Sequence, residues 1–398
     1  MLTLFGTRPE AIKLAPVVHA LEQRREFIRT INVSSGQHTE LLYPFVALFG
    51  IRVDYNLRLM STEQSVGELL RRVVAGVSDV IVSEQPDLII VQGDTTTALG
   101  GAIAGQKCGV PVAHVEAGLR SGNLRSPYPE EIHRIAISGL ASIHFAATER
   151  NRNTLLEEGI REGAIFVAGN PIVDALQMVR RVKQQSTITE LLAAIGDRKC
   201  LVLTAHRRES FGSLLRENLL MLRDFVQEHA DVVLVFPVHP NLNVRVPAQE
   251  ILEGHPRINL TGPLSYFDFI HLVLRSWLVV SDSGGIQEEV PSLGKPLLIL
   301  RENTERPECI EAGMARLVGR GSEKLRSMLE EAYQPNSWVN YVQKTPNPFG
   351  CGDSGERIAN RIVSLLKVQP VRSETKAKPL HMSSPANIRR QALEVGTL

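Results

Sequence analysis

The chain has 398 residues, enough for two domains with separate cores, and its 43% hydrophobic and 22% charged content is typical of a folded globular protein. A formal net charge of +1 argues against nucleic acid or an anionic membrane as the main partner. The four cysteines are scattered without metal-binding spacing, which predicts reduced thiols. No apolar run approaches the ~18 residues of a membrane helix, and a strand at the N-terminus leaves no room for a signal peptide. We therefore expect a cytoplasmic protein.

The first predicted element is a short apolar strand at residues 2–5, followed by Gly6-Thr7-Arg8-Pro9-Glu10 and a helix with one apolar stripe. A glycine turn before a helix is a natural anion site, and Arg8 and Lys13 would add positive charge there. Taken alone, each is more often a solvated charge. The turn matches neither G-x-G-x-x-G nor G-K-[ST], so a dinucleotide or P-loop site is not predicted.

Strands and helices continue to alternate through the first half of the chain. The strand at 30–35 ends in Gly36-Gln37-His38, and a long amphipathic helix stops before Pro86. Further strands are predicted at residues 88–91, 110–115, 143–147 and 165–167. This alternation is typical of a doubly wound parallel sheet.

Two successive strands of this half end on an acid. Asp94 follows the strand at 88–91, and Glu116 follows the strand at 110–115. Parallel strands joined by a right-handed crossover lie side by side or nearly so, with neighbours ~4.8 Å apart, so both acids should emerge at one carboxyl edge. Open α/β sheets bind ligands at that edge. Glu130 and Glu131 start the next helix, and several carboxylates around one cleft predict proton transfer.

Each acid also has a purely structural interpretation. Asp94, which precedes three threonines, is about as often a helix cap as a functional group. Glu130 and Glu131 would complement a helix dipole after Pro129 at the first helical position. Glu116 has no such local role between a buried strand and Ala117-Gly118. The conjunction of these acids, more than any one of them, predicts a site.

The charged stretch at 180–199 is interpreted as a linker to a second alternating half. Strands are predicted there at residues 200–204, 232–236, 258–260, 278–280, 297–300 and 315–318. We expect a first domain at 1–170, a second at 171–352 and a helix at 353–367 that packs back on the first domain. The polar tail at 368–398 is expected to be disordered.

The second half carries candidate diphosphate-binding residues. Ser283-Gly284-Gly285 follows a buried strand, where backbone N–H groups bind a diphosphate well, although a tight turn that needs glycine is an equally good explanation. Glu289 is placed to accept from ribose hydroxyls, and Arg306 lies on the same rim. His206 ends a strand beside two arginines that should lower its pKa. A strand-end histidine is more often structural, but this one would face the acids across an interdomain cleft.

Taken together, these motifs resemble the non-hydrolysing UDP-N-acetylglucosamine 2-epimerases, bacterial enzymes of the GT-B fold. The resemblance covers residues 1–366. The matching motifs are F-G-T-R-P-E-A-I-K (5–13), G-Q-H (36–38), Q-G-D-T-T-T (92–97), H-V-E-A-G-L-R (114–120), P-E-E (129–131), A-H-R-R-E (205–209), S-D-S-G-G-I-Q-E-E (281–289) and T-E-R-P-E (304–308). The resemblance implies two Rossmann-like doubly wound domains that face an interdomain cleft.

The resemblance also implies a reaction. A base removes the C2 proton of UDP-N-acetylglucosamine while UDP leaves C1, and UDP adds back after reprotonation on the opposite face, giving UDP-N-acetylmannosamine for cell-surface polysaccharides. Proton transfer would fall to Asp94, Glu116 and Glu130, with His206 near the leaving phosphate. The matching substrate-binding positions are Arg8 and Lys13 in the first domain and Phe269, Ser283, Gly284, Gly285, Glu289 and Arg306 in the second. No metal or nicotinamide is implied, and a homodimer is expected.

Some positions depart from the family pattern. His133 stands where asparagine is common, Thr39 where arginine is usual, and Pro171 where threonine is usual. Many bacterial members are activated by their own substrate near Gln37-His38, and Thr39, Glu40 and Glu63 put that activation in doubt.

Four alternatives stay open. They are a hydrolysing 2-epimerase that releases free N-acetylmannosamine, a 2-epimerase of a modified UDP-sugar, a GT-B glycosyltransferase, and a UDP-sugar-binding protein without turnover. The abundance of acids favours proton transfer over glycosyl transfer.

Overall fold

The structure is a computed structural model. It describes residues 1–36, 39–61, 64–125, 127–182, 186–207 and 210–366. The expected activator contacts at Gln37-His38, the acidic Glu63 and the tail predicted at 368–398 lie outside these residues.

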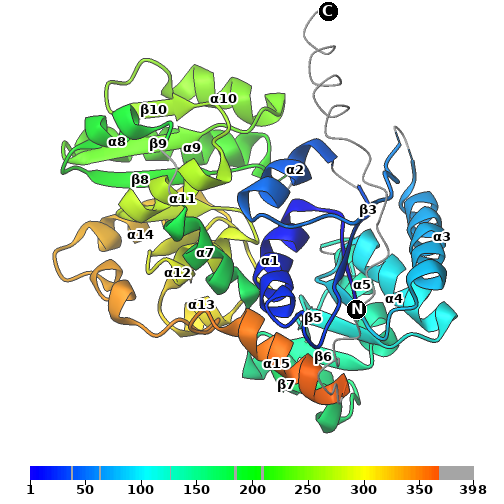
Figure 1. Cartoon of the computed structure of the whole chain (residues 1–398). Helices are drawn as coiled ribbons and strands as arrows, with labels where there is room; N and C mark the ends of the chain where they lie inside the picture. The colour runs from blue at the N-terminus through cyan, green and yellow to red at the C-terminus, as the bar shows by residue number, and fades with distance from the viewer. Residues whose placement is uncertain (37–38, 62–63, 126, 183–185, 208–209, 367–398) are drawn as a thin grey trace, which may run out of the picture.

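Two parallel sheets form the scaffold (Figure 1). The first sheet has the order β3-β2-β1-β4-β5-β6-β7, and its strands are β1 (Leu2–Phe5), β2 (Ile31–Ser34), β3 (Tyr55–Asn56), β4 (Ile89–Gln92), β5 (Val112–Ala117), β6 (Ile143–Ala146) and β7 (Ile165–Val167). The second has the order β10-β9-β8-β11-β12-β13, and its strands are β8 (Lys199–Thr204), β9 (Val232–Pro237), β10 (Ile258–Thr261), β11 (Leu278–Ser281), β12 (Leu297–Ile299) and β13 (Ala315–Leu317). The alternating α/β prediction is confirmed.

Both sheets reverse their strand order at one point, between β1 and β4 in the first and between β8 and β11 in the second. Ligands of open α/β sheets bind outside the carboxyl ends of the strands at such a point. The central strands β1, β4 and β11 are buried along their whole length because helices cover both faces of each sheet. The two switch points are therefore the expected edges of a site.

The helices of the first half connect its strands and continue into α7, which leads to the second half. They are α1 (Arg8–Glu22), α2 (Thr39–Leu48), α3 (Val66–Glu84), α4 (Thr96–Cys108), α5 (Glu130–Leu140), α6 (Glu149–Glu157), the 3-10 turn η1 (Glu162–Ala164) and α7 (Pro171–Arg181). The later helices are α8 (Thr189–Ile195), α9 (Ser213–Glu228), α10 (Leu242–Leu252), α11 (Tyr266–Arg275), α12 (Ile286–Ser292), α13 (Glu308–Glu311), α14 (Ser322–Tyr333), the 3-10 turns η3 (Trp338–Asn340) and η4 (Val342–Lys344), and α15 (Ser354–Leu366).

Helix α7 joins the two halves. It packs against α1 of the first half and against α11 and α12 of the second, and one apolar cluster runs through all of them. The last helix, α15, returns to lie against α1 (Figure 1). A side chain at Gly355 would meet the Pro16 carbonyl oxygen at 2.6 Å, so glycine permits this close crossing.

Two local predictions were wrong. The stretch interpreted as a linker contains the helix α8. Asp268 holds the segment before this helix, because its carboxylate accepts from Ser186 Oγ at 2.8 Å and from the Thr187 amide at 2.9 Å. Pro129 precedes α5 as its cap residue and is not its first helical residue. Within the described part of the chain, none of the helices combines the length and apolarity needed to span a bilayer.

Candidate active site

Two adjoining cavities lie between the halves at the switch points of the two sheets. One, of about 820 Å³, is lined mainly by apolar side chains from α2, α11 and the ends of β8 and β9. The other, of about 280 Å³, is lined by charged and polar groups. Arg8, Ser283, Ile286 and Glu289 line both, so the two cavities adjoin, and together they are called the cleft. Every residue to which the family resemblance assigned catalysis or substrate binding lines one of them, whereas Glu131 lines neither.

Asp94 is not the cap of α4. Thr95 has that role, because its side chain accepts from the Ala98 amide at 3.0 Å. The Asp94 carboxylate instead pairs with Arg134 at 2.5 Å, and its carbonyl oxygen accepts from His133 Nδ1 at 2.9 Å. The capping interpretation of Asp94 is therefore wrong, and its carboxylate faces the polar cavity.

Glu116 lies within β5 at an irregularity in the pairing with β6 and has a left-handed backbone with φ of +67°. This conformation costs a non-glycine residue ~1–2 kcal/mol. The side chain is buried and is held by hydrogen bonds from Gln92 Nε2 and Lys13 Nζ. Gly118 follows with φ of +85°, where a Cβ would meet the Asn151 carbonyl oxygen at 2.1 Å. The bent end of β5 thus aims a carboxyl group into the cleft.

Lys13 connects the two halves of the chain. Its ammonium contacts Glu116 of the first half and lies 2.6 Å from Glu288 Oε2 of the second. Glu288 also pairs with Arg306 Nε at 2.5 Å. Burial raises the pKa of Glu116, assisted by the Glu288 charge and opposed by Lys13. The pKa of Glu288 is lowered despite its burial, because Arg306 and Lys13 both stabilise its charge.

Glu130 and Glu131 have different surroundings although they are neighbours. Glu130 lines the polar cavity, and its Oε2 is buried without a hydrogen-bond partner among the described residues. Glu131 is almost fully buried and accepts from the Ser121 and Gly122 amides and from Arg134 Nη1 at 2.7 Å. Glu131 therefore stabilises the loop before α5, whereas Glu130 lines the polar cavity.

The glycine turn after β11 is flanked by two guanidinium groups. A Cβ at Gly284 would lie 3.3 Å from Arg306 Nη1 and 3.4 Å from Arg207 Nη2. A turn without side chains next to two arginines is a suitable surface for a diphosphate. Arg207 lies within the A-H-R-R-E motif but was not among the predicted substrate-binding residues.

His206 follows β8 at the edge of the apolar cavity. Its Nδ1 lies 3.4 Å from Asp282 Oδ1, and its ring stacks on His239 with centroids 5.9 Å apart. The pKa of His206 is lowered, as predicted, but desolvation is the main cause. Asp282 opposes it, and the cations Arg207 and Arg8 contribute less than burial does.

The apolar cavity has an aromatic wall from both halves. Phe45 of α2 and Tyr266 of α11 lie 5.3 Å apart between ring centroids, and the Arg8 guanidinium lies 5.6 Å from the Phe45 ring. Phe269 lines the same cavity. Tyr266 Oη donates to Glu289 at 3.2 Å, and burial raises the pKa of Glu289 to about 7. A planar base and a ribose would fit this combination of rings and a carboxyl group.

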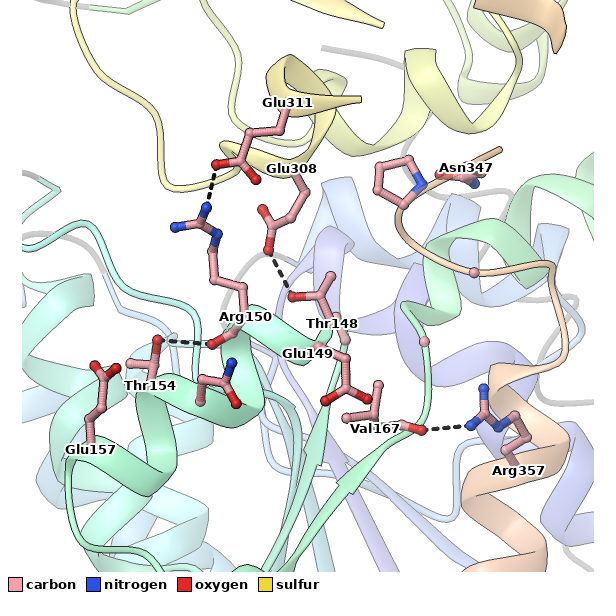
Figure 2. Close-up of a pocket in the computed structure, with 15 residues that line it drawn as sticks. Thr148, Glu149, Arg150, Thr154, Glu157, Val167, Glu308, Glu311, Asn347 and Arg357 are labelled. Atoms are coloured by element: carbon pink, nitrogen blue, oxygen red, sulfur yellow. Dashed lines mark hydrogen bonds and ion pairs between the residues drawn. The ribbon is translucent and has the colours of Figure 1, made fainter. Parts of the chain in front are cut away.

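A third cavity, of about 740 Å³, lies elsewhere along the boundary of the two halves and shares no lining residue with the cleft (Figure 2). Thr148 donates to Glu308 at 2.8 Å across it, and Arg150 pairs with Glu311. Arg357 donates to the Val167 carbonyl oxygen at its rim. These contacts link α6 to α13, and none of the predicted site residues lies here.

One group of potential metal ligands exists among the described residues, formed by Glu228, His229 and Glu330. These residues line neither cavity of the cleft. His229 is instead packed between Phe225 and Tyr333, with centroids 4.2 Å from each ring. The polar cavity is lined by acidic and cationic side chains.

Residues 19–363 match the protein-family model described as UDP-N-acetylglucosamine 2-epimerase. The UDP-N-acetylglucosamine 2-epimerases of Yersinia pestis and Escherichia coli K12 are 43% and 41% identical over 364 residues, covering 90% of this chain and 96% of each relative. The Neisseria meningitidis UDP-GlcNAc 2-epimerase, solved with UDP-GlcNAc bound, superposes with a TM-score of 0.84 at 37% identity, covering 91% and 99% of the two chains. A Staphylococcus aureus relative solved with UDP also has a TM-score of 0.84, at 38% identity and with 94% and 99% coverage.

Proposed function

The chain belongs to the UDP-N-acetylglucosamine 2-epimerase family, with its GT-B-like fold of two Rossmann-like halves, and from this premise we propose that it interconverts UDP-N-acetylglucosamine and UDP-N-acetylmannosamine without hydrolysis. The observation that supports this best is the juxtaposition in one cleft of three acids from the first half with a glycine turn and two arginines from the second. The acids suit proton transfer at a sugar carbon, and the arginines suit a departing diphosphate.

The uracil and ribose are proposed to occupy the apolar cavity. Phe269 and Tyr266 line it, and Glu289 lies at its junction with the polar cavity. The diphosphate would then lie over Ser283-Gly284-Gly285, between Arg207 and Arg306, with His206 near the leaving oxygen. This arrangement directs the sugar towards Asp94, Glu116 and Glu130.

The proposed reaction is an elimination followed by an addition. A carboxylate removes the C2 proton, the C–H electrons form a C1=C2 double bond, and the C1–O bond breaks with its electrons on UDP. A proton then returns to the opposite face of C2, and a phosphate oxygen attacks C1. Arg8, Lys13 and Arg306 would stabilise the charge on the departing diphosphate.

Two faces of C2 require two proton-transfer groups in different protonation states. The raised pKa of Glu116 favours a protonated carboxyl group, which is suited to donate. Glu130, with its unpaired buried oxygen, and Asp94, which faces Arg134, are the proposed acceptors. Because the C2 proton is weakly acidic, exclusion of water by closure of the halves would assist its removal.

Proton NMR of the purified protein with UDP-N-acetylglucosamine in D2O tests this proposal. Deuterium at C2 together with UDP-N-acetylmannosamine is the expected result. Free N-acetylmannosamine and UDP would instead assign the hydrolysing reaction. UDP binding without exchange would contradict the proposed substrate and point to a modified UDP-sugar or to binding without turnover.

We further propose that the protein is a cytoplasmic homodimer that associates through helices of the first half. Four apolar side chains, Val66 and Val82 on α3 and Ile132 and Ile135 on α5, are exposed in the single chain. Exposed apolar side chains of this kind are candidates for burial between subunits. Light scattering coupled to size-exclusion chromatography should give twice the 44.0 kDa mass of one chain, and a monomer would contradict this proposal.

A further inference from the structure

Glu288 lies outside the set of residues that the sequence analysis selected, yet it contacts two of them. Its carboxylate is almost fully buried and bridges Lys13 Nζ at 2.6 Å and Arg306 Nε at 2.5 Å. Glu288 belongs to the second half, whereas Lys13 belongs to the first. The pair therefore forms only while the two halves are together.

The same ammonium also binds Glu116. Lys13 thus lies between two buried carboxylates, one from each half, and each competes for its charge. The charged groups that act on Glu116 come from three elements: Lys13 of α1, Glu288 of α12, and Arg306 in the segment before α13. Gln92 Nε2 also donates to Glu116 and carries no charge.

We propose that Glu288 is a positioning residue that acts across the domain boundary, sharing Lys13 with Glu116 on closure and adding its own negative charge, so that Glu116 holds a proton. This inference rests on the proposed function and specifies how its acid is prepared. When the halves separate, Glu288 leaves, Lys13 pairs with Glu116 alone, and water reaches both. Glu116 therefore holds the proton that it donates only while the cleft is closed.

The two charges beside Glu116 shift its pKa in opposite directions. A nearby negative charge favours the neutral form of a carboxyl group, and a nearby ammonium favours the charged form. Burial contributes most to the raised pKa of Glu116, Lys13 opposes it, and Glu288 adds to it. Closure both buries Glu116 and adds Glu288, so closing the cleft takes up a proton, and a higher proton concentration in turn favours closure.

The test compares wild type with Glu288→Gln, which keeps the size of the side chain and removes its charge. Calorimetry of UDP-N-acetylglucosamine binding in buffers of different ionisation enthalpy should show that wild type takes up more protons, or releases fewer, than the variant does near neutral pH, because Glu289 titrates alike in both proteins. The alkaline limb of the pH profile for kcat should move about one unit lower, as expected for removal of a neighbouring charge. UDP affinity should change by less than about threefold, because Arg207 and Arg306 remain.

Glu305→Gln is the matched control. Glu305 is also a buried carboxylate near Arg306, with Oε2 at 3.5 Å from Nη1, but it forms no ion pair with Lys13. Its variant should keep the wild-type alkaline limb and proton uptake. An unchanged limb in Glu288→Gln, or an equal shift in both variants, would overturn the inference.

A failure of the proposed function has a different signature. Wild type would then show no C2 exchange, so there would be no pH profile of kcat whose alkaline limb could be compared. The difference in proton uptake between wild type and Glu288→Gln on binding of the UDP-sugar would still test the coupling between Glu288 and Glu116. If Glu288→Gln fails to fold, Glu288→Asp provides a second variant, since a shorter carboxylate keeps the charge and should retain the wild-type limb at reduced kcat.

Discussion

The Arg134 guanidinium lies 2.5 Å from the Asp94 carboxylate and thereby connects the end of β4 to the first turns of α5. Arg134 is buried and also pairs with Glu131 at 2.7 Å, so a single cation holds one proposed catalytic acid and one structural acid. The geometry of the acid cluster therefore depends on a residue that itself need not touch the substrate.

Replacing Arg134 by alanine should reduce both stability and activity. Removal of one partner from a buried ion pair leaves uncompensated charge and typically costs ~3–5 kcal/mol. Thermal and urea unfolding would measure this loss. Arg150→Ala is the control, because the Arg150–Glu311 pair is exposed and such pairs contribute at most about 1 kcal/mol. Similar losses in the two variants would contradict the assignment.

Glu130 and Glu131 should respond differently to replacement by glutamine. Glu130→Gln removes a proposed proton-transfer group, so C2 exchange should fall by roughly 10²–10⁴-fold while UDP binding and stability change little. Glu131→Gln weakens the hydrogen bonds to the Ser121 and Gly122 amides and to Arg134, so its main effect should be on unfolding. Exchange by NMR and urea titration distinguish the two. Equal effects on both measurements would indicate that the two acids have similar roles.

Gly118 and Gly159 form a matched pair for testing the bend at the end of β5. Both are left-handed, with φ of +85° and +84°, but only at Gly118 would a Cβ collide with backbone, at 2.1 Å from the Asn151 oxygen. Gly159→Ala should therefore cost only the ~1–2 kcal/mol of the conformation. Gly118→Ala should cost clearly more and should also reduce kcat, because Glu116 lies two residues away. Equal unfolding free energies would argue against close packing at Gly118.

The positions of the first-half acids followed from the sequence because they depend on short-range rules. Alternating patterns located β4 and β5, and the crossover rule placed the residues after them at one sheet edge. The sequence could not identify Thr95 as the cap of α4, because both residue types cap helices and aspartate is in general the better cap of the two.

The contacts between the halves were even less predictable. The Lys13–Glu288 pair joins residues 275 positions apart and depends on how α7 sets the two sheets against each other. The hydrophobic periodicity of a sequence carries no information about contacts between residues so far apart along the chain. The helix α8 was missed for a related reason, since seven residues have little intrinsic stability and the Asp268 contacts before it come from a distant part of the chain.

Binding of the UDP-sugar should depend on pH through Glu289. Burial raises the pKa of this carboxyl group to about 7, above the 4.5 of an exposed glutamate, so the free protein is largely protonated there below neutral pH. A ribose hydroxyl donates more strongly to a carboxylate than to a neutral acid. The contribution of Glu289 should therefore strengthen binding as pH increases through 7 and weaken it by up to about tenfold per unit below it.

Calorimetry with UDP-N-acetylglucosamine is the suitable measurement, because its diphosphate diester does not titrate in this range whereas the terminal phosphate of UDP does. Glu289→Gln should bind with a flatter pH dependence and with an affinity near that of wild type at the acidic end. His206 and Glu116 remain in this variant, so any pH dependence that persists unchanged would belong to those groups. That outcome would exclude Glu289 as the group whose ionisation strengthens binding.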